Sequence, residues 1–438
     1  MTSGLTLTIG GVGITNNAGI LQHFVTDGGQ IRFTNSSTVT GNVFIENDGS
    51  GSTNFFDSST AGNSVIFNED GSTNFFNSST AGNSEIFNED GSTNFFDSST
   101  AGNSVIIDRG GISVLQFLDR STAGNSNITA QGGAVNFSDT STAGSATINI
   151  LATGSGAFLS FEDSSRGGTA RIELTTFGNR PAILDISAHN APGLTIGSLD
   201  GNETAIVSLG ANNLTIGSNN LSTTFSGVIQ DGTGGSLTKI GSGTFILAGA
   251  NTYTGDTNVN GGVLQVHGSI TSNTFVNHGG TLAGTGTING NVTNNGRVSP
   301  GDSPGVLTVV HNYTQAQYAT LIIQIADMGP DQFSVLDVMG NANLSGFLDP
   351  VLLNGFVPTI GDSFTFLNYA SFTGEFSHIK HEIFDNGMLQ WSVIYQNNNA
   401  ILTVGPNTIP DQGSAFLLLT LGLLGLLTFR RQLLRGQP

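Results

Sequence analysis

A 20-residue segment that repeats with almost no change constrains the fold of this chain more than any other feature. Residues 54–73 read NFFDSSTAGNSVIFNEDGST, and residues 74–93 read NFFNSSTAGNSEIFNEDGST. A unit this short cannot bury its own apolar face, so tandem units must stack to build a core. The repeat therefore predicts an all-β fold, a right-handed parallel β-helix (β-solenoid) with coils of about 20 residues. The element STAG marks successive coils, beginning at Ser59, Ser79, Ser99, Ser121 and Ser141.

Two columns of the aligned copies stay apolar, and they predict the interior of the solenoid. Stacked coils lie ~4.8 Å apart, so each side chain should pack on its counterpart in the next coil. Each fully buried Phe or Ile would contribute ~1.5–3 kcal/mol. The first column stands five residues before the STAG threonine and holds Phe33, Phe55, Phe75, Phe95, Phe117, Phe137 and Phe161. The second stands six residues after it and holds Phe44, Ile66, Ile86, Ile106, Ile128, Ile148 and Ile172.

The polar turns should form ladders as well. Asn side chains stacked along one axis can hydrogen-bond amide to amide, and the glycines beside them suit a corner with positive φ. The expected Asn ladder consists of Asn63, Asn83, Asn103 and Asn125.

Composition excludes several classes of protein. The chain has no Cys, which excludes disulfides, thiolate metal sites and a cysteine nucleophile. It has 12 Lys and Arg against 31 Asp and Glu, a net charge of −19. A nucleic-acid partner is excluded, since phosphate contacts need clustered cations.

The chain divides into four predicted parts. Residues 1–182 are the regular solenoid, and residues 183–315 keep short β runs in a looser register. Residues 316–405 have clearer alternation and longer turns, which predicts a small β-sandwich or β-roll cap over the open end of the solenoid. Residues 406–438 contain the uncharged apolar run 415–429, which predicts a hydrophobic helix.

Residues 237–315 contain two stretches that carry a family resemblance. One is AGANTYTG at 248–255, and the other is SPGDSPG at 299–305. They resemble the passenger-associated transport repeat of bacterial autotransporters. The resemblance implies a parallel β-helix on an exported surface protein, and nothing catalytic.

The C-terminal tail resembles a second known module. Residues 409–414 read IPDQGS, the apolar run follows, and two arginines come after it. Together they resemble a PEP-CTERM-type sorting signal, closest to its VPDSG variant, with Ile409 and Gln412 as departures. The resemblance implies export, a membrane contact through the helix and processing by an exosortase-type enzyme; a plain tail anchor is the alternative. The matching positions are Pro410, Asp411, Gly413, Arg430 and Arg431.

The first residues do not read as a secretory leader. MTSGLTLTIGGVGITNNAG lacks a basic region and a continuous apolar run. The expectation is that Met1 lies inside a longer gene product, or that the start is misplaced.

Catalytic chemistry finds little support in the repeats. Ten acidic residues lie between Glu46 and Asp108, yet no Lys or Arg lies between Phe33 and Asp108. Hydrolases place two or three carboxylates in one spot with distinct environments, whereas here they recur in every coil, as structural turns do. We therefore predict no enzyme, no catalytic or cofactor-binding residues, and no metal site. The recurring column holds Asp57, Asp97, Asp119, Asp139 and Asp163, with Asn77 substituting once.

Three surface features leave alternatives open. The acidic turns at 69–70 and 89–90 stack one coil apart, and Ca²⁺ could relieve their repulsion, although solvated turns explain them too. The pair His378 and His381 is either exposed or a metal pair. The outward stripe of Phe56, Phe76 and Phe96 is either a sticky face for a partner or glycan, or a surface covered by a loop.

The sequence thus predicts an exported bacterial surface protein of structural or adhesin-like role, on the cell surface, outer membrane or outside the cell, with envelope or matrix polysaccharide as a candidate partner. The alternative is a secreted β-helix carbohydrate-active enzyme, a lyase or glycoside hydrolase. A hollow with three convergent carboxylates, or an Arg facing acids, would favour the enzyme.

Overall fold

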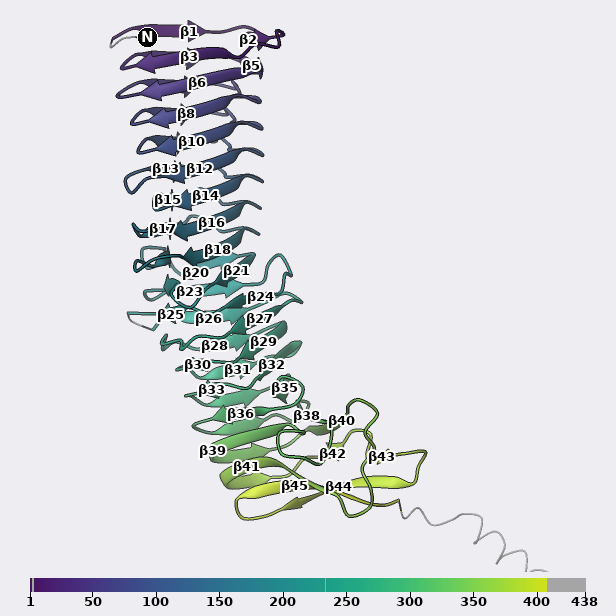
Figure 1. The fold of residues 1–438 in the computed structure, drawn as a ribbon. Coiled ribbons are helices and arrows are strands. Elements are labelled where there is room, and N and C mark those ends of the chain that lie inside the picture. Colours follow the sequence, from purple (N-terminus) through teal and green to yellow (C-terminus); the bar gives the residue numbers. More distant parts are fainter. Residues whose placement is uncertain (2–3, 233, 408–438) are drawn as a thin grey trace, which may run out of the picture.

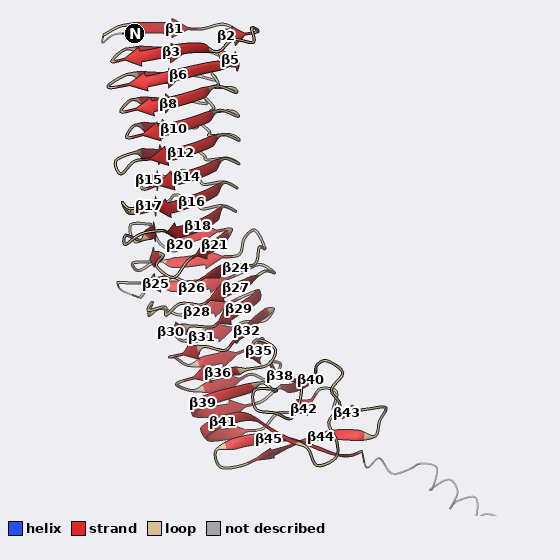
Figure 2. Cartoon of the chain, in the orientation of Figure 1, coloured by secondary structure: helices blue, strands red, loops and turns tan. Residues whose placement is uncertain are grey.

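The computed structural model describes residues 1, 4–232 and 234–407. Figure 1 shows short strands wound into coils that stack in one column, with β1 at one end and β44 and β45 at the other. Every regular element in the described residues is a strand, as Figure 2 shows by colour. The predicted all-β solenoid is confirmed.

One regular coil shows how the sequence produces this winding. β8 (Val65–Glu69) lies on one face, the chain turns at a corner formed by Asp70 and Gly71, and β9 (Ser72–Phe75) lies on the adjacent face. The chain then crosses a third face at Thr80, where one bridge joins it to Thr60 of the preceding coil and a second joins it to Thr100 of the next. Asp70 has a φ of 58°, a left-handed conformation that Asp tolerates better than most residues. Three straight segments and three corners therefore give a triangular coil.

Each face is a stack of parallel strands in register. The first face consists of β1 (Thr6–Ile9), β4 (Gln30–Phe33), β7 (Ser52–Phe55), β9, β11 (Ser92–Phe95), β13 (Val114–Phe117), β15 (Ala134–Phe137), β17 (Ala157–Phe161), β19 (Ala182–Asp185), β22 (Ile206–Ser208) and β25 (Val228–Gln230). The second face consists of β3 (Gln22–Asp27), β6 (Val43–Asp48), β8, β10 (Glu85–Glu89), β12 (Val105–Arg109), β14 (Asn127–Gln131), β16 (Thr147–Ala152), β18 (Arg171–Thr176), β21 (Ser198–Gly201), β24 (Thr223–Phe225), β27 (Thr244–Leu247), β29 (Gly262–Val266), β32 (Gly280–Gly284), β35 (Arg297–Pro300), β38 (Thr320–Ile325), β40 (Phe347–Leu352) and β42 (His378–Ile379).

The third face begins with a strand pair and threonine bridges and becomes a full sheet further along. Its first strands are β2 (Gly13–Asn16) and β5 (Thr38–Gly41). The sheet that follows contains β20 (Gly193–Ile196), β23 (Asn213–Ile216), β26 (Ser236–Lys239), β28 (Thr257–Val259), β31 (Thr274–Val276), β34 (Val292–Asn294), β37 (Tyr313–Gln315), β39 (Val335–Leu344) and β41 (Ser363–Gly374). Beyond β25, the first face continues as β30 (Ser269–Ile270), β33 (Thr287–Ile288) and β36 (Val306–Val309), and β36 pairs with β39.

The far end of the column changes to antiparallel pairing. β41 pairs with β45 (Asn399–Pro406), β45 pairs with β44 (Leu389–Tyr395), and β44 pairs with β43 (Ile383–Phe384). Parallel stacking continues past residue 316 through β39, β41 and β42, so only the last strands depart from the solenoid pattern. Alternation along one strand is the same in a parallel coil and in an antiparallel sheet, which is why the sequence pattern does not separate the two.

The core runs along the inside of the whole column. Its largest fully buried side chains include Trp391 near the antiparallel end and the phenylalanines of the first face. Trp391 packs its ring against Phe364 and Phe384, at centroid distances of 6.0 and 4.5 Å. These contacts close the apolar interior at that end.

The predicted helix 415–429 and all five sorting-signal positions lie outside the described residues. No helix long and apolar enough to cross a membrane occurs in residues 1, 4–232 and 234–407.

Candidate functional site

The ladder phenylalanines and isoleucines line the inside of the column. Ring centroids of successive phenylalanines lie 4.6–4.8 Å apart, from Phe33 to Phe161, and the stacked rings are nearly parallel. The two columns are fully shielded from solvent, so they hold the frame and cannot contact a ligand. The stacked residues are Phe55, Phe75, Phe95, Phe117 and Phe137 on the first face and Ile66, Ile86, Ile106, Ile128 and Ile148 on the second.

One position of the isoleucine column differs from the alignment. Ile45 pairs with Ile66 and is fully buried, whereas Phe44 pairs with Val65 on the outer side. The first repeat has one extra residue between its threonine and this strand, and a shift of one residue moves a side chain to the opposite face.

The expected Asn ladder at the corners is exposed. Asn83, Asn103 and Asn125 each donate through Nδ2 to the Oδ1 of the preceding Asn, at 3.2–3.3 Å. These amides therefore hydrogen-bond to one another along the corner.

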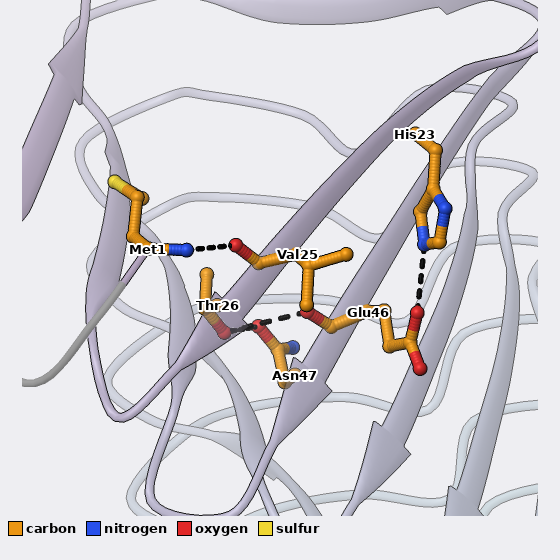
Figure 3. A network of polar contacts seen from close by, with 6 residues as sticks. All are labelled: Met1, His23, Val25, Thr26, Glu46 and Asn47. Atoms are coloured by element: carbon orange, nitrogen blue, oxygen red, sulfur yellow. Dashed lines mark hydrogen bonds and ion pairs between the residues drawn. The ribbon is translucent and has the colours of Figure 1, made fainter.

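A second Asn ladder lies inside the column, and the sequence pattern did not predict it. Asn47, Asn68 and Asn88 are fully buried, and each donates through Nδ2 to the next coil; the first two of these bonds measure 2.7 Å. Figure 3 shows its start, where the Thr26 hydroxyl donates to Asn47 Oδ1 at 2.8 Å. Thr73 of the facing strand donates to Asn68 Oδ1 at 2.8 Å. Alternation could have revealed it, since Asn68 stands two residues after buried Ile66 and shares its face.

Asp108 ends this inner ladder with a carboxyl group. Its Oδ1 accepts the hydrogen bond from Asn88 Nδ2, while its Oδ2 is buried without a partner. The next coil places Ala130 at this position. Burial raises the pKa of Asp108 from 3.8 to about 7, and the bond from Asn88 opposes that rise. The carboxyl group at the end of this buried polar row therefore keeps its proton at mildly acidic pH, where a solvated Asp is ionised.

The side chains of the outer Asp column accept hydrogen bonds from backbone N–H groups at the turns. Asp57 N–H donates to Asn77 Oδ1, and Asn77 N–H donates to Asp97 Oδ2, at 3.0 and 2.8 Å. The same contact continues through Asp119, Asp139 and Asp163. Each side-chain oxygen thus satisfies a backbone N–H of the preceding coil, at residues with φ between 52° and 59°.

The three open surface features have the following geometry. Phe56, Phe76 and Phe96 are half-buried and stack at 4.8 and 4.9 Å, with the Arg32 guanidinium 4.5 Å from the Phe56 ring centre. His378 and His381 are exposed, and the acidic corners border a hollow of about 160 Å³. Within the described ranges, no group of three His, Cys, Asp or Glu residues is arranged to hold a metal ion.

A hollow of about 410 Å³ on the second face brings an Arg against two acids. Glu173 on β18 and Asp200 on β21 are register partners. Arg171 contacts Glu173 and lies 4.0 Å from Asp200 Oδ2. Burial raises the pKa of Asp200, Arg171 lowers it, and Glu173 raises it further. The sequence pattern did not single out this group because Asp200 stands 27 positions after Glu173, in coils of irregular length.

The strands after residue 236 contain a buried cation. Lys239 on β26 is 1% exposed, and its Nζ donates to the carbonyl oxygens of Ile240, Gly241 and Gly261 at 2.6–3.3 Å. Burial lowers the pKa of Lys239 to about 8. In the same segment, buried Tyr253 shares a hydrogen bond of 2.7 Å with Thr257.

Residues 237–266, which span these contacts, match the family described as Passenger-associated-transport-repeat. The chain carries a passenger-associated transport repeat. The match covers the first part of the predicted segment 237–315, from β26 to the end of β29. Residues 409–433 match the family described as VPDSG-CTERM motif, which lies outside the described residues.

Relatives of this chain come from bacteria and match small parts of long proteins. An extracellular serine protease of Serratia marcescens is 42% identical over 96 residues, which is 22% of this chain and 9% of that protein. The adhesin BmaC autotransporter of Brucella suis biovar 1 (strain 1330) is 41% identical over 110 residues, which is 24% of this chain and 3% of that protein.

A solved structure is also similar to the chain. The crystal structure of the Haemophilus influenzae Hap adhesin matches 92% of this chain and 59% of its own, with 11% identity and a TM-score of 0.31. The transport repeat, the sorting motif and the secreted relatives identify a bacterial cell-surface or extracellular protein.

Proposed function

We propose that this chain is the rod of an adhesin-like surface protein. The observation that carries the proposal is the continuous second face, whose strands stack in parallel from β3 to β42. The inward side chains pack in the core or form hydrogen-bonded ladders, and the outward side chains are mostly Ser, Thr, Asn, Asp and Glu. Such a rod is stiff because each coil is hydrogen-bonded to two neighbours, and it holds its surface away from the cell.

The sorting motif supplies the proposed attachment. A bacterial membrane contact through residues 415–429 and an exosortase-type processing enzyme are the partners we propose, and the matched motif at 409–433 supports both. An envelope or matrix polysaccharide is the proposed surface partner.

The test combines location with attachment. Native protein from the cell-surface fraction should have an intact mass that lacks the segment after about Ile409, and antibodies should label whole cells. Deleting the gene should reduce attachment of cells to one another or to a matrix-coated surface. Full-length protein in the membrane fraction would contradict processing, and unchanged attachment would contradict the adhesin-like role.

A carbohydrate-active enzyme is the second candidate, and one observation favours it. Arg171 faces Glu173 and Asp200 at the 410 Å³ hollow, and lyases and hydrolases work with such groups. If this candidate holds, purified protein should release reducing ends or unsaturated products from a polysaccharide, and Glu173→Gln and Asp200→Asn should each abolish the release. A rod function predicts no release from either the native protein or the variants.

A further inference from the structure

A second hollow lies on the same face, close to the antiparallel end of the column. Its volume is about 230 Å³, and it spans neighbouring coils at β32, β35, β38 and β40, with Lys380 just after β42 at its edge. This volume falls below that of a pocket that encloses a whole drug-sized ligand. It fits one unit of a longer molecule whose other units lie outside.

The strand register places side chains of different chemistry in one outward column. Arg297 pairs with Thr320, Thr320 pairs with Phe347, and Phe347 pairs with His378. Because neighbouring strands lie ~4.8 Å apart, Arg297 and Phe347 are separated by roughly 10 Å. The Thr320 hydroxyl therefore lies between the basic side chain of Arg297 and the aromatic ring of Phe347.

The charge of this hollow opposes that of the whole chain. Arg297, Lys380 and His278 line it, and none of its lining residues is an Asp or Glu. Lys380 forms an ion pair with nearby Asp349 at 3.4 Å. Within the described part of the chain, no carboxylate lies within ion-pair distance of Arg297. In a protein with a net charge of −19, this leaves one guanidinium available to an anion.

The remaining groups suit a sugar ring. Tyr318 at the rim is 78% exposed, which is unusual for so large an apolar ring. Lys380 Nζ donates to Thr320 Oγ1 at 3.2 Å and lies 5.4 Å from the Phe347 ring centre. A pyranose presents C–H groups on one face and hydroxyls at its edge, so it can pack on an aromatic face while its edge meets donors.

We propose that this hollow binds one carboxylate-bearing sugar of an acidic polysaccharide, with Arg297 holding the carboxylate and Tyr318 packing on the ring. The guanidinium fork matches a carboxylate in a two-bond contact. This inference rests on the proposed surface function and names the class of partner.

The experiment measures binding of the full-length purified protein to polygalacturonate, with neutral dextran and dextran sulfate as comparison probes. The native protein should bind polygalacturonate, should bind more weakly as salt is added, and should not bind dextran. Arg297→Gln should weaken binding about ten-fold or more, since a charge-assisted two-bond contact is lost. Tyr318→Ala should weaken it as well, and Arg297→Lys should retain part of the affinity.

Arg120→Gln is the matched control, since Arg120 is exposed on a distant coil. It should leave binding unchanged, and all variants should melt at the same temperature as the native protein. Equal binding by Arg297→Gln, or equal binding of dextran and polygalacturonate, would overturn the proposal. Binding of dextran sulfate alone would overturn the assignment of a carboxylate.

A cell assay separates this inference from the surface function. If attachment of cells is lost with the gene but kept with Arg297→Gln, the rod function stands and this site does not. If the purified protein binds polygalacturonate through Arg297 but cells never display it, the site stands and the surface function fails.

Discussion

Replacing Asp108 by Asn should make the stability of the central coils much less sensitive to pH. Asp108 keeps its proton in the fold up to a pKa of about 7, whereas the unfolded chain releases it near 3.8. Between these values the native state binds more protons, so the free energy of unfolding falls as pH rises from about 4 to about 7 and stays low above that. The two pKa values differ by an amount that corresponds to about 4 kcal/mol.

The substituted amide would carry no charge at either end of this range, and its carbonyl oxygen would still accept the hydrogen bond from Asn88. The difference in free energy of unfolding between Asp108→Asn and the native protein should therefore favour the variant by up to about 4 kcal/mol more at pH 8 than at pH 4. Hydrogen exchange of peptides from β10 and β12 is the suitable assay, because coils of a solenoid open locally. Comparing variant and native protein at the same pH cancels the intrinsic pH dependence of exchange.

Asp97→Asn is the matched control, because Asp97 is exposed and Asn77 already occupies the same column. It should change protection equally at both pH values. If the protection of Asp108→Asn differs from that of the native protein by the same amount at pH 4 and at pH 8, the carboxyl is charged inside the fold and the reasoning above is wrong.

Three further substitutions test the packing. Phe95→Ala should cost about 3–5 kcal/mol by opening the inner ring stack, whereas Phe96→Ala on the outer side should cost less than about 1.5 kcal/mol; equal losses in denaturant titrations would contradict the inside–outside assignment. Ser84→Ala should be neutral within about 0.5 kcal/mol, because its buried hydroxyl has no partner, and a large drop in melting temperature would show that one exists. Lys239→Met should cost about 1–3 kcal/mol by leaving three part-buried carbonyl oxygens without their donor, and unchanged thermal unfolding would refute that role.

Most of the fold could be predicted from the period of the repeat. A unit of 20 residues cannot bury its own apolar face, so units that place Phe at the same position must stack on one another. The packing of the Phe55 ring on the Phe75 ring follows from this stacking. The extra residue before Ile45 could not be seen, because Phe44 is equally apolar and the alignment contains no gap signal. Local hydrophobicity alone does not fix register.

The polar interior was harder to predict than the apolar one. Asn68 stands beside Glu69 and Asp70, so the local composition reads as a solvated turn, yet its side chain points inward and bonds to Asn88. The hollows at Arg171 and Arg297 arise from residues in different coils whose spacing is irregular. Such groupings depend on the register between coils, which the loose repeats do not reveal.

The near-identity of successive coils has a consequence for the length of the rod. Residues 74–93 make up one complete coil, which is almost identical in sequence to residues 54–73, and its strand β10 pairs in register with β8 of that coil. Recombination between the copies can remove or add one coil while every new junction repeats an existing one. The reach of the rod can thus change in steps of ~4.8 Å, leaving its two ends and their surfaces intact.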